Sequence, residues 1–143
     1  MKRLLYLFLL VALTTACSKN SPDVTPDTAT TIAGMYEVST LSQTGAGGNM
    51  TYTLPLTNTS NGVTVTLSGQ IGVVKKTETT VGMTLTLKTT GQPDNNQDIG
   101  TLEIKGTDLY SGTTKVGTAD GTNLILDTAN SDGTRAKVVA KKK

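Results

Sequence analysis

Apolar and polar residues alternate along most of the chain from residue 33 onward. Within residues 50–56 every second position is apolar, and Thr51, Thr53 and Pro55 stand between. The same period recurs over residues 63–67 and 81–88, again with threonine at most of the intervening positions. This period predicts antiparallel strands with one face buried and the other in water. Threonine suits the wet face because its branched side chain fits the pleat while its hydroxyl meets water.

Short turns separate the alternating segments. Asn-Gly at 61–62 and Asp-Gly at 120–121 and 132–133 are signals for tight hairpins. The longest predicted connection covers residues 91–98, and no segment after the N-terminal region shows a helical period. The pattern predicts about eight strands, near residues 34–42, 49–56, 62–75, 79–89, 98–105, 108–118, 122–128 and 134–141.

These strands predict an all-β fold. Parallel strands need crossovers of a dozen residues or more, and the chain has none. We therefore expect an antiparallel up-and-down meander that closes into a barrel, with a two-sheet β-sandwich as the alternative. From Ala33 on, Trp and Phe are absent and the aromatic residues are Tyr36, Tyr52 and Tyr110. Such an interior suits either a packed core or a cavity for one small ligand.

The N-terminus follows a different pattern. Lys2 and Arg3 precede a ten-residue apolar run, Leu4 to Leu13, and small residues then lead to Cys17, the only cysteine. A positive start, a short apolar run and small residues are the layout of a secretory signal peptide. The run is too short to span a bilayer, which needs about 20 residues. We expect a cleaved signal peptide over residues 1–16.

Residues 1–17 resemble the signal of bacterial lipoproteins, in which small residues lead to an obligatory cysteine. Thr14 stands where that family usually has Leu. The resemblance implies cleavage before Cys17, a thioether from its thiol to diacylglycerol, and acylation of the new amine; the alternative is a free thiol in a secreted protein. Two or more acyl chains hold a protein durably on a membrane. Because Ser18 stands where many inner-membrane lipoproteins carry Asp, the resemblance favours the outer membrane of the cell envelope.

Residues 17–32 are polar, contain two prolines and lack hydrophobic periodicity. They predict a lipidated flexible tether in front of a single domain at 33–143. Loss of Lys2 and Arg3 with the signal reduces 13 basic residues to 11, which equals the 11 acidic residues. A chain without net charge has no general attraction for nucleic acid. The chain has no histidine, so the usual general base near neutral pH is missing.

The start of the predicted domain resembles the lipocalin-like superfamily, whose first strand opens with a Gly-x-Trp motif. Gly34 matches the glycine and Tyr36 takes the Trp place. Residues 107–110 are similar to that family's Thr-Asp-Tyr corner, with an extra residue after Asp108, and Arg135 lies in the last predicted strand, where the family has an Arg that packs over the opening aromatic. A cation on a ring is worth about 1 kcal/mol. The resemblance implies that Gly34, Tyr36, Asp108 and Arg135 are structural and close the barrel.

Catalytic and metal chemistry find little support in the sequence. Asp94, Asn95, Asn96 and Asp98 offer oxygen ligands of the kind that Ca²⁺ prefers, but the glycine and distal glutamate of an EF-hand loop are missing. We interpret this segment as a solvated hairpin tip. We predict no catalytic residues, no metal site, no enzymatic activity and no cofactor apart from the covalent lipid.

Two functions from different classes fit this pattern best, and a third, an envelope inhibitor or a carbohydrate-contacting accessory protein, has no motif in its favour. The first is a membrane-anchored cell-envelope lipoprotein whose lipocalin-like domain binds a small apolar ligand. The second is a structural or interaction lipoprotein that docks another envelope protein through a strand edge or Thr-rich face, without a small-molecule ligand. The predicted pocket lining, which could equally be a closed core, is Met50, Tyr52, Leu54, Met83, Leu85 and Leu87.

Overall fold

The computed structural model describes residues 26–143, so the predicted signal peptide and Cys17 lie outside the described residues. Within the described part the chain forms one short helix, α2 (Thr28–Ile32), and ten strands. The strands are β1 (Gly34–Gly45), β2 (Gly48–Thr53), β3 (Leu56–Ser60), β4 (Val63–Lys75), β5 (Thr80–Thr89), β6 (Asn95–Lys105), β7 (Asp108–Ser111), β8 (Thr114–Ala119), β9 (Asn123–Ala129) and β10 (Arg135–Lys142).

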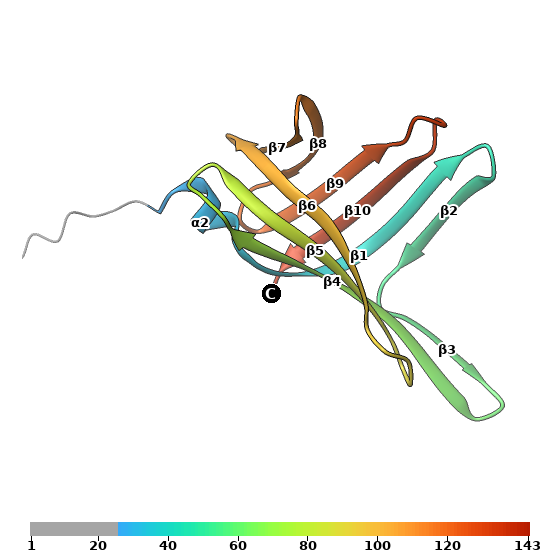
Figure 1. The fold of residues 1–143 in the computed structure, drawn as a ribbon. Helices are drawn as coiled ribbons and strands as arrows, with labels where there is room; N and C mark the ends of the chain where they lie inside the picture. The colour runs from blue at the N-terminus through green and yellow to red at the C-terminus, as the bar shows by residue number, and fades with distance from the viewer. Residues whose placement is uncertain (1–25) are drawn as a thin grey trace, which may run out of the picture.

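Eight of the strands form a closed antiparallel barrel (Figure 1). Around the ring the order is β1, β10, β9, β8, β7, β6, β5 and β4, and β4 pairs back to β1. In this closing pair, residues 34–37 of β1 lie opposite residues 70–73 of β4. From β4 to β10 each strand is the sequence neighbour of the next, so the all-β, up-and-down barrel predicted from the sequence is confirmed and the sandwich alternative is not.

The two remaining strands, β2 and β3, lie outside the closed ring. From Thr40 onward β1 pairs with β2 instead of β4, and β4 pairs with β3 over residues 63–67 before it reaches β1. The β1–β2 pair and the β3–β4 pair diverge from the point where β2 ends and β3 begins (Figure 1). The barrel is therefore closed at the end near α2 and split at the opposite end, which we call the mouth.

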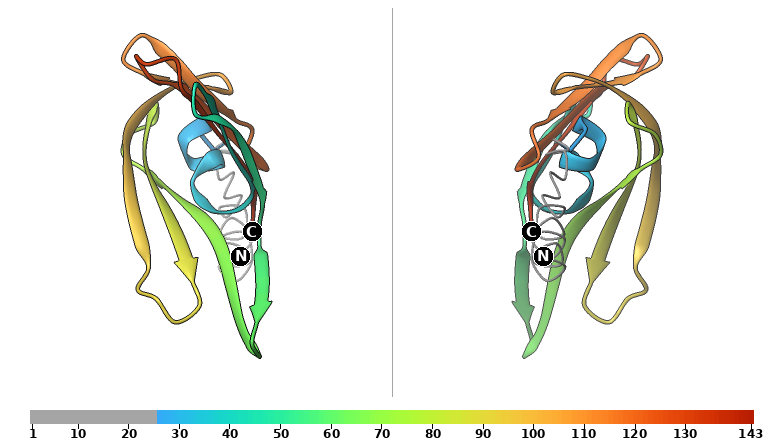
Figure 2. Two further views of the ribbon diagram at one scale, coloured as in Figure 1. Left: turned by 90° about the vertical axis from the view of Figure 1, so that its right-hand side faces the viewer. Right: turned by 90° about the vertical axis from the view of Figure 1, so that its left-hand side faces the viewer.

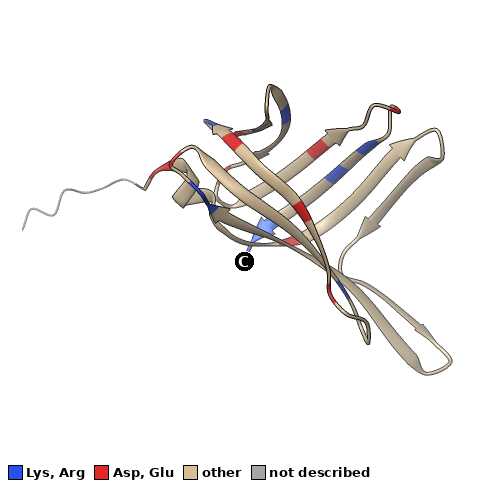
Figure 3. Ribbon diagram, in the orientation of Figure 1, with Lys and Arg blue, Asp and Glu red and all other residues tan. Residues whose placement is uncertain are grey.

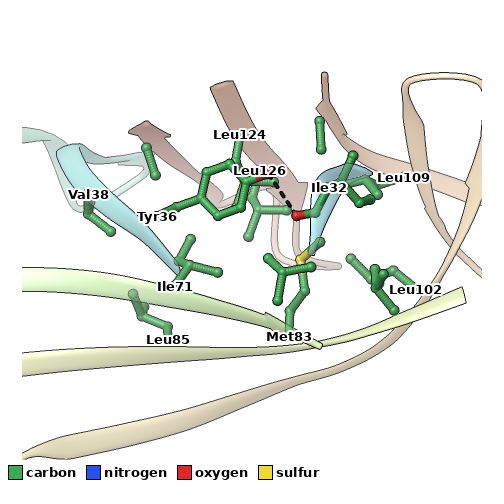
Figure 4. Packing of buried hydrophobic residues seen from close by; sticks show 14 of the residues in the cluster. Ile32, Tyr36, Val38, Ile71, Met83, Leu85, Leu102, Leu109, Leu124 and Leu126 are labelled. Carbon is green, nitrogen blue, oxygen red and sulfur yellow. Dashed lines mark hydrogen bonds between the residues drawn. The ribbon is translucent and has the colours of Figure 1, made fainter. Parts of the chain in front are cut away.

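The core occupies the closed part of the barrel, where inward-facing apolar side chains from every strand of the ring meet (Figure 4). Tyr36 is fully buried there, and its hydroxyl donates a 2.8 Å hydrogen bond to the carbonyl oxygen of Ile32. Every buried side chain of the described residues belongs to an apolar or aromatic residue. The largest fully buried side chains are those of Tyr36, Ile32, Ile71, Met83, Leu102, Leu109, Leu124 and Val81.

Helix α2 plugs the closed end. Viewed along the barrel, it lies within the ring of strands (Figure 2), and its residues Ala29 and Ile32 are buried in the core. The side chain of Asp27 caps the helix by accepting a 2.9 Å hydrogen bond from the Thr30 N–H. The predicted tether ending at residue 32 is therefore wrong at its C-terminal end. Two apolar residues are too few to show the helical period by which a sequence reveals a helix.

Two of the predicted strands differ from the structure. The predicted strand 49–56 corresponds to β2, which ends at Thr53 shortly before Pro55, because proline has no N–H to give to a ladder. Strand β3, which begins at Leu56, was not predicted. The predicted strand 108–118 separates into β7 and β8, where Gly112 adopts a positive φ of 60° in the connecting turn. The barrel has the predicted number of strands only because β7 and β8 count separately while the segment 49–56 lies outside the ring.

Candidate functional site

A hollow of about 270 Å³ opens at the mouth of the barrel. Strand pairing places its apolar side chains together: Leu41 of β1 lies opposite Tyr52 of β2 on one side and Val138 of β10 on the other. Directly opposed residues of antiparallel strands project to the same face, so these three side chains share the inner surface. The hollow is lined by Leu41, Ser42, Gln43, Met50, Tyr52, Leu85, Leu87, Ala136, Lys137 and Val138.

A β-bulge sets which residues of β1 reach the hollow. The pairing of β1 with β10 shifts register between Val38 and Thr40. Val38 projects into the closed core, and the extra residue allows Leu41, three positions later, to face inward as well. A regular strand would have turned Leu41 to the outer face. The bulge therefore supplies the apolar floor of the hollow.

The apolar inner surface continues beyond the hollow onto the β3–β4 hairpin. Leu56 lies opposite Leu67, and Val63 and Val65 follow on the same face of β4. The exposed fractions are high for such residues: 49% for Met50, 44% for Tyr52 and Leu56, 64% for Val63 and 40% for Val65. Contiguous patches of exposed apolar side chains often mark binding surfaces.

Of the six residues predicted to line a pocket, the structure brings four together in the hollow: Met50, Tyr52, Leu85 and Leu87. Leu54 and Met83 belong instead to the closed core, with exposed fractions of 6% and 1%. Leu54 fills the seam between β1 and β4, where a methyl group added to Gly69 would meet Val38 and Leu54 at 3.1–3.2 Å.

The sequence pattern missed the floor residues Leu41 and Val138 and the neighbouring Ala136. The alternation in β10 could have indicated Val138, because residues 136, 138 and 140 share one face. The alternation in β1 is broken by the bulge, so no sequence signal places Leu41 inside.

The residues predicted to close the barrel have mixed roles. Gly34 begins β1 opposite Val73, and Tyr36 is the buried centre of the closed end. Asp108 lies at the start of β7 and pairs with Lys115 of β8 at 2.8 Å, which raises the pKa of that lysine and stabilises the local hairpin. Gly34 and Tyr36 thus lie where the barrel closes, whereas Asp108 does not.

Arg135 does not pack over Tyr36, and the role expected for it is wrong. It lies at the mouth end of β10, opposite Thr44, and its guanidinium pairs with Asp127 at 3.0 Å. Lys142 takes the predicted place of a cation at the opening aromatic. Its Nζ lies 5.9 Å from the centroid of the Tyr36 ring and donates a 2.7 Å hydrogen bond to the Thr31 carbonyl at the end of α2.

Strongly perturbed carboxylates lie at the closed end. The Lys75 ammonium and the Thr30 N–H both donate to Asp27, and they lower its pKa to about 2. The backbone and side-chain N–H groups of Asn123, together with the Thr122 N–H, lower the pKa of Asp120 to about 2. Both groups stabilise the ends of elements around α2, which is a structural role.

The hairpin tip at residues 94–98 is held by local contacts. Asp94 pairs with Lys88 at 3.4 Å, and Asp98 accepts a 2.9 Å hydrogen bond from the Gly100 N–H. Among residues 26–143 no three acidic, histidine or cysteine side chains gather as they would around a metal ion. The helix in this part of the chain is too short and too polar to cross a bilayer.

No protein-family model matches the sequence, and no curated protein matches it. Solved structures that resemble the chain include designed barrels. A redesigned beta barrel covers 80% of this chain and 94% of its own, with 16% identity and a TM-score of 0.49. A second redesigned beta barrel, solved bound to DFHBI, covers 80% and 97% with 16% identity and a TM-score of 0.47. A de novo designed fluorescence-activating barrel covers 82% and 98% with 12% identity and a TM-score of 0.43.

Proposed function

We propose that this chain is a membrane-anchored cell-envelope lipoprotein whose lipocalin-like barrel binds a small apolar ligand at its mouth. The observation that supports ligand binding is the hollow itself. Leu85 and Leu87 contribute to an apolar floor, and Met50 and Tyr52 stand half exposed at its edge. Concave apolar surfaces with a few polar groups are the usual form of small-molecule sites.

The size of the hollow bounds the affinity. A volume of about 270 Å³ lies near the lower limit of ligand pockets. A ligand that covers about 200 Å² of apolar surface gains about 5 kcal/mol before the costs of immobilisation. We therefore expect modest affinity, and a ligand that extends from the hollow along the β3–β4 hairpin gains more.

Titration with the neutral fluorescent dye N-phenylnaphthylamine tests this proposal. The chain from Ser18 onward is suitable because it contains every described strand, α2 and the whole core. Two methionines provide a matched pair: Met50 at the mouth is 49% exposed, and Met35 on the outer wall is 47% exposed. We expect Met50→Gln to weaken dye binding several-fold, because a polar group then lies in the apolar site, and Met35→Gln to leave it unchanged.

Two results would contradict apolar ligand binding at the mouth. One is the absence of any saturable dye binding to the folded chain. The other is equal weakening by Met50→Gln and Met35→Gln, which would place the dye on a general apolar surface.

The second candidate function, docking of another envelope protein, is favoured by the free strand edges. Among residues 26–143, β2 and β3 stand at the two ends of the strand order, so each has one edge that no described strand pairs with. Such edges can accept a partner strand unless charge or proline blocks them. A photo-crosslinking residue at position 58 of β3 tests this in cells: a single specific protein adduct favours docking, and its absence together with a bound apolar molecule favours ligand binding.

The proposed lipid anchor rests on the sequence of residues 1–17, which lie outside the described residues. The described chain begins at the closed end of the barrel, nine residues after Cys17. In this proposal the chain from the anchor at Cys17 enters the domain at its closed end. Growth with labelled palmitate should label the protein, Cys17→Ala should abolish the label, and fractionation should place the labelled chain in the outer membrane.

We also propose that the protein is neither an enzyme nor a nucleic-acid binder. The mature chain would carry 11 basic and 11 acidic residues, so it lacks the excess of positive charge that nucleic-acid binding uses. The perturbed carboxylates Asp27 and Asp120 lie in helix-cap and turn positions instead of in the hollow. Salt-dependent binding of DNA or RNA by the purified chain would contradict the second part of this proposal.

A further inference from the structure

By strand register, no charged residue within residues 26–143 occupies an inward position at the mouth; Lys137 borders the hollow from an outward position. Opposed positions along β5 and β6 bring Leu85 next to Gln97 and Leu87 next to Asn95 on this face. Tyr52 adds a phenol hydroxyl to this surface, which can donate and accept hydrogen bonds. By strand register the inner positions around the mouth are Leu41, Gln43, Met50, Tyr52, Leu56, Asn58, Ser60, Val63, Val65, Leu67, Leu85, Leu87, Asn95, Gln97, Thr128, Ala136 and Val138.

Charged side chains near the mouth lie on the outer face. Lys88 pairs with Asp94, and Arg135 pairs with Asp127. Lys137 borders the hollow, but it lies opposite Asp127 and Ser42 at outward positions of the alternation. β2, β3 and the adjoining parts of β1 and β4 carry no charge on either face, because no charged residue occurs between Glu37 and Lys75 (Figure 3).

From this distribution we infer that the mouth selects uncharged apolar molecules and discriminates against molecules of the same chain length that end in a carboxylate or an ammonium group. The inference rests on the proposed ligand binding and specifies the chemical class of the ligand. A charged group brought to this surface loses water and finds no opposite charge to replace it. A neutral polar group loses less hydration free energy, and one hydrogen bond to the protein can compensate for that loss.

Gln43 supplies such a partner. Its side chain lines the hollow beside Met50, its opposed residue on β2. A side-chain amide both donates and accepts hydrogen bonds, so it can pair with a hydroxyl, an ester or an amide of the ligand. The site therefore fits an apolar chain with a neutral polar end.

A matched set of short amphiphiles tests the selection. Decanol, decanoate and decylammonium have the same alkyl chain, and each is titrated in competition with N-phenylnaphthylamine at pH 7 against the chain from Ser18 onward. We expect decanol to displace the dye at concentrations about tenfold lower than either charged analogue. If decanoate or decylammonium binds as tightly as decanol, ligand binding stands and the selection for neutral molecules is overturned. If none displaces the dye and the dye does not bind, the proposed function itself fails.

The pH of the titration supplies an internal control. Decanoate becomes neutral below the usual carboxyl pKa of about 4.5. Its competition strength should rise toward that of decanol between pH 7 and pH 4, while that of decanol stays constant. The pKa values of Asp27 and Asp120, about 2, keep these two carboxylates charged at pH 4, and circular dichroism at each pH checks that the barrel is folded. Unchanged decanoate binding over this range would overturn the inference.

A pair of lysine substitutions on β1 locates the effect. Gln43→Lys places a cation in the hollow, whereas Thr44→Lys places one on the outer face at the next position, opposite Arg135. We expect Gln43→Lys to tighten decanoate binding about tenfold relative to decanol, and Thr44→Lys to leave the ratio unchanged. Equal effects of the two substitutions would mean that long-range charge controls selection, which contradicts a role for the inner surface.

Discussion

The two ends of this barrel are built from the same alternating strands, yet they are finished in opposite ways. At the closed end, β1 pairs with β4, α2 fills the interior and Tyr36 is fully buried. At the mouth, the same two strands part, each pairs with a short extra strand, and apolar side chains remain 40–64% exposed. At the closed end the chain itself covers the apolar surface, whereas at the mouth the apolar surface is exposed to solvent.

Charge follows the same division. The closed end is fastened by polar contacts: Lys75 donates to the helix cap Asp27, and Lys142 donates to the Thr31 carbonyl at the other end of α2. At the mouth, by strand register, no inward position of the described residues carries a charge, and Lys137 borders the hollow from the outer face. A surface that only had to stay soluble would carry charges, as exposed strand edges usually do. The stabilising polar contacts thus lie at the closed end, and the uncharged inner face fits the ligand binding proposed for the mouth.

The largest effect that separates the two ends is expected from two tyrosines. Tyr36→Ala removes a fully buried ring and should lower the free energy of unfolding by about 3–5 kcal/mol. Tyr52→Ala at the mouth should lower it by less than about 1 kcal/mol, because that side chain is 44% exposed. Urea unfolding of both variants measures the difference, and Tyr36→Phe isolates the hydrogen bond to Ile32, worth about 1 kcal/mol. Equal losses for the two alanine variants would contradict the division of roles.

A smaller effect on stability is expected from Lys142, which links β10 to α2 at the closed end. Lys142→Met removes the contact with the Tyr36 ring and the hydrogen bond to the end of α2, and we expect a loss of about 1 kcal/mol. Lys137→Met on the outer wall is the matched control and should be neutral. Thermal unfolding compares the two variants. Similar melting temperatures would mean that the contacts of Lys142 do not stabilise the closed end.

Acid should act on the closed end through Asp27 and Asp120. Their pKa values are lowered from 3.8 to about 2 in the folded chain, so the unfolded chain binds protons first as the pH falls. Their stabilisation is complete above about pH 4 and is lost as the pH falls toward 2. We expect the melting temperature to decrease over this window, and less so in Asp120→Asn. Asp94→Asn, at the hairpin near the mouth, is the control and should keep the full dependence.

The smallest effect on stability is expected at the β3–β4 hairpin. Val65→Thr keeps the shape of an exposed, inward-facing side chain and adds a hydroxyl, so unfolding should change by less than about 0.5 kcal/mol. If the hairpin contributes to the apolar site, dye binding should nevertheless weaken. A large loss of stability without a change in binding would assign this hairpin to the fold and not to the function.

Sequence periodicity was sufficient for the barrel because the strands are long and regular. Residues 63–67 and 81–88 alternate regularly, and they lie in β4 and β5, whose bounds are within one residue of the expected ones. The prediction fails at local irregularities of the chain. Strand β2 ends before the proline at 55, the glycine at 112 divides a predicted strand, and the bulge near Ser39 turns Leu41 to the inner face.

The candidate site was predicted only in part for a related reason. Alternation tells which residues face inward, but not how far along a strand the barrel stays closed. Met83 and Leu87 lie on the same face of β5, yet Met83 is buried in the core of the closed part of the barrel and Leu87 lines the hollow. The boundary between them depends on where β1 leaves β4 for β2, a long-range pairing that no short segment encodes. The cation at the opening aromatic was likewise misassigned to Arg135, because register places Lys142 there.

The most direct test of the central claim is native mass spectrometry of the chain purified from its own cells without denaturation, beside the Met50→Gln variant. The account predicts a non-covalent adduct of a neutral, apolar molecule that organic extraction removes and that Met50→Gln reduces, while Met35→Gln keeps it. A wild-type chain that carries no adduct and takes up neither decanol nor the neutral dye would contradict the claim, and the free edges of β2 and β3 would then become the better candidate for function.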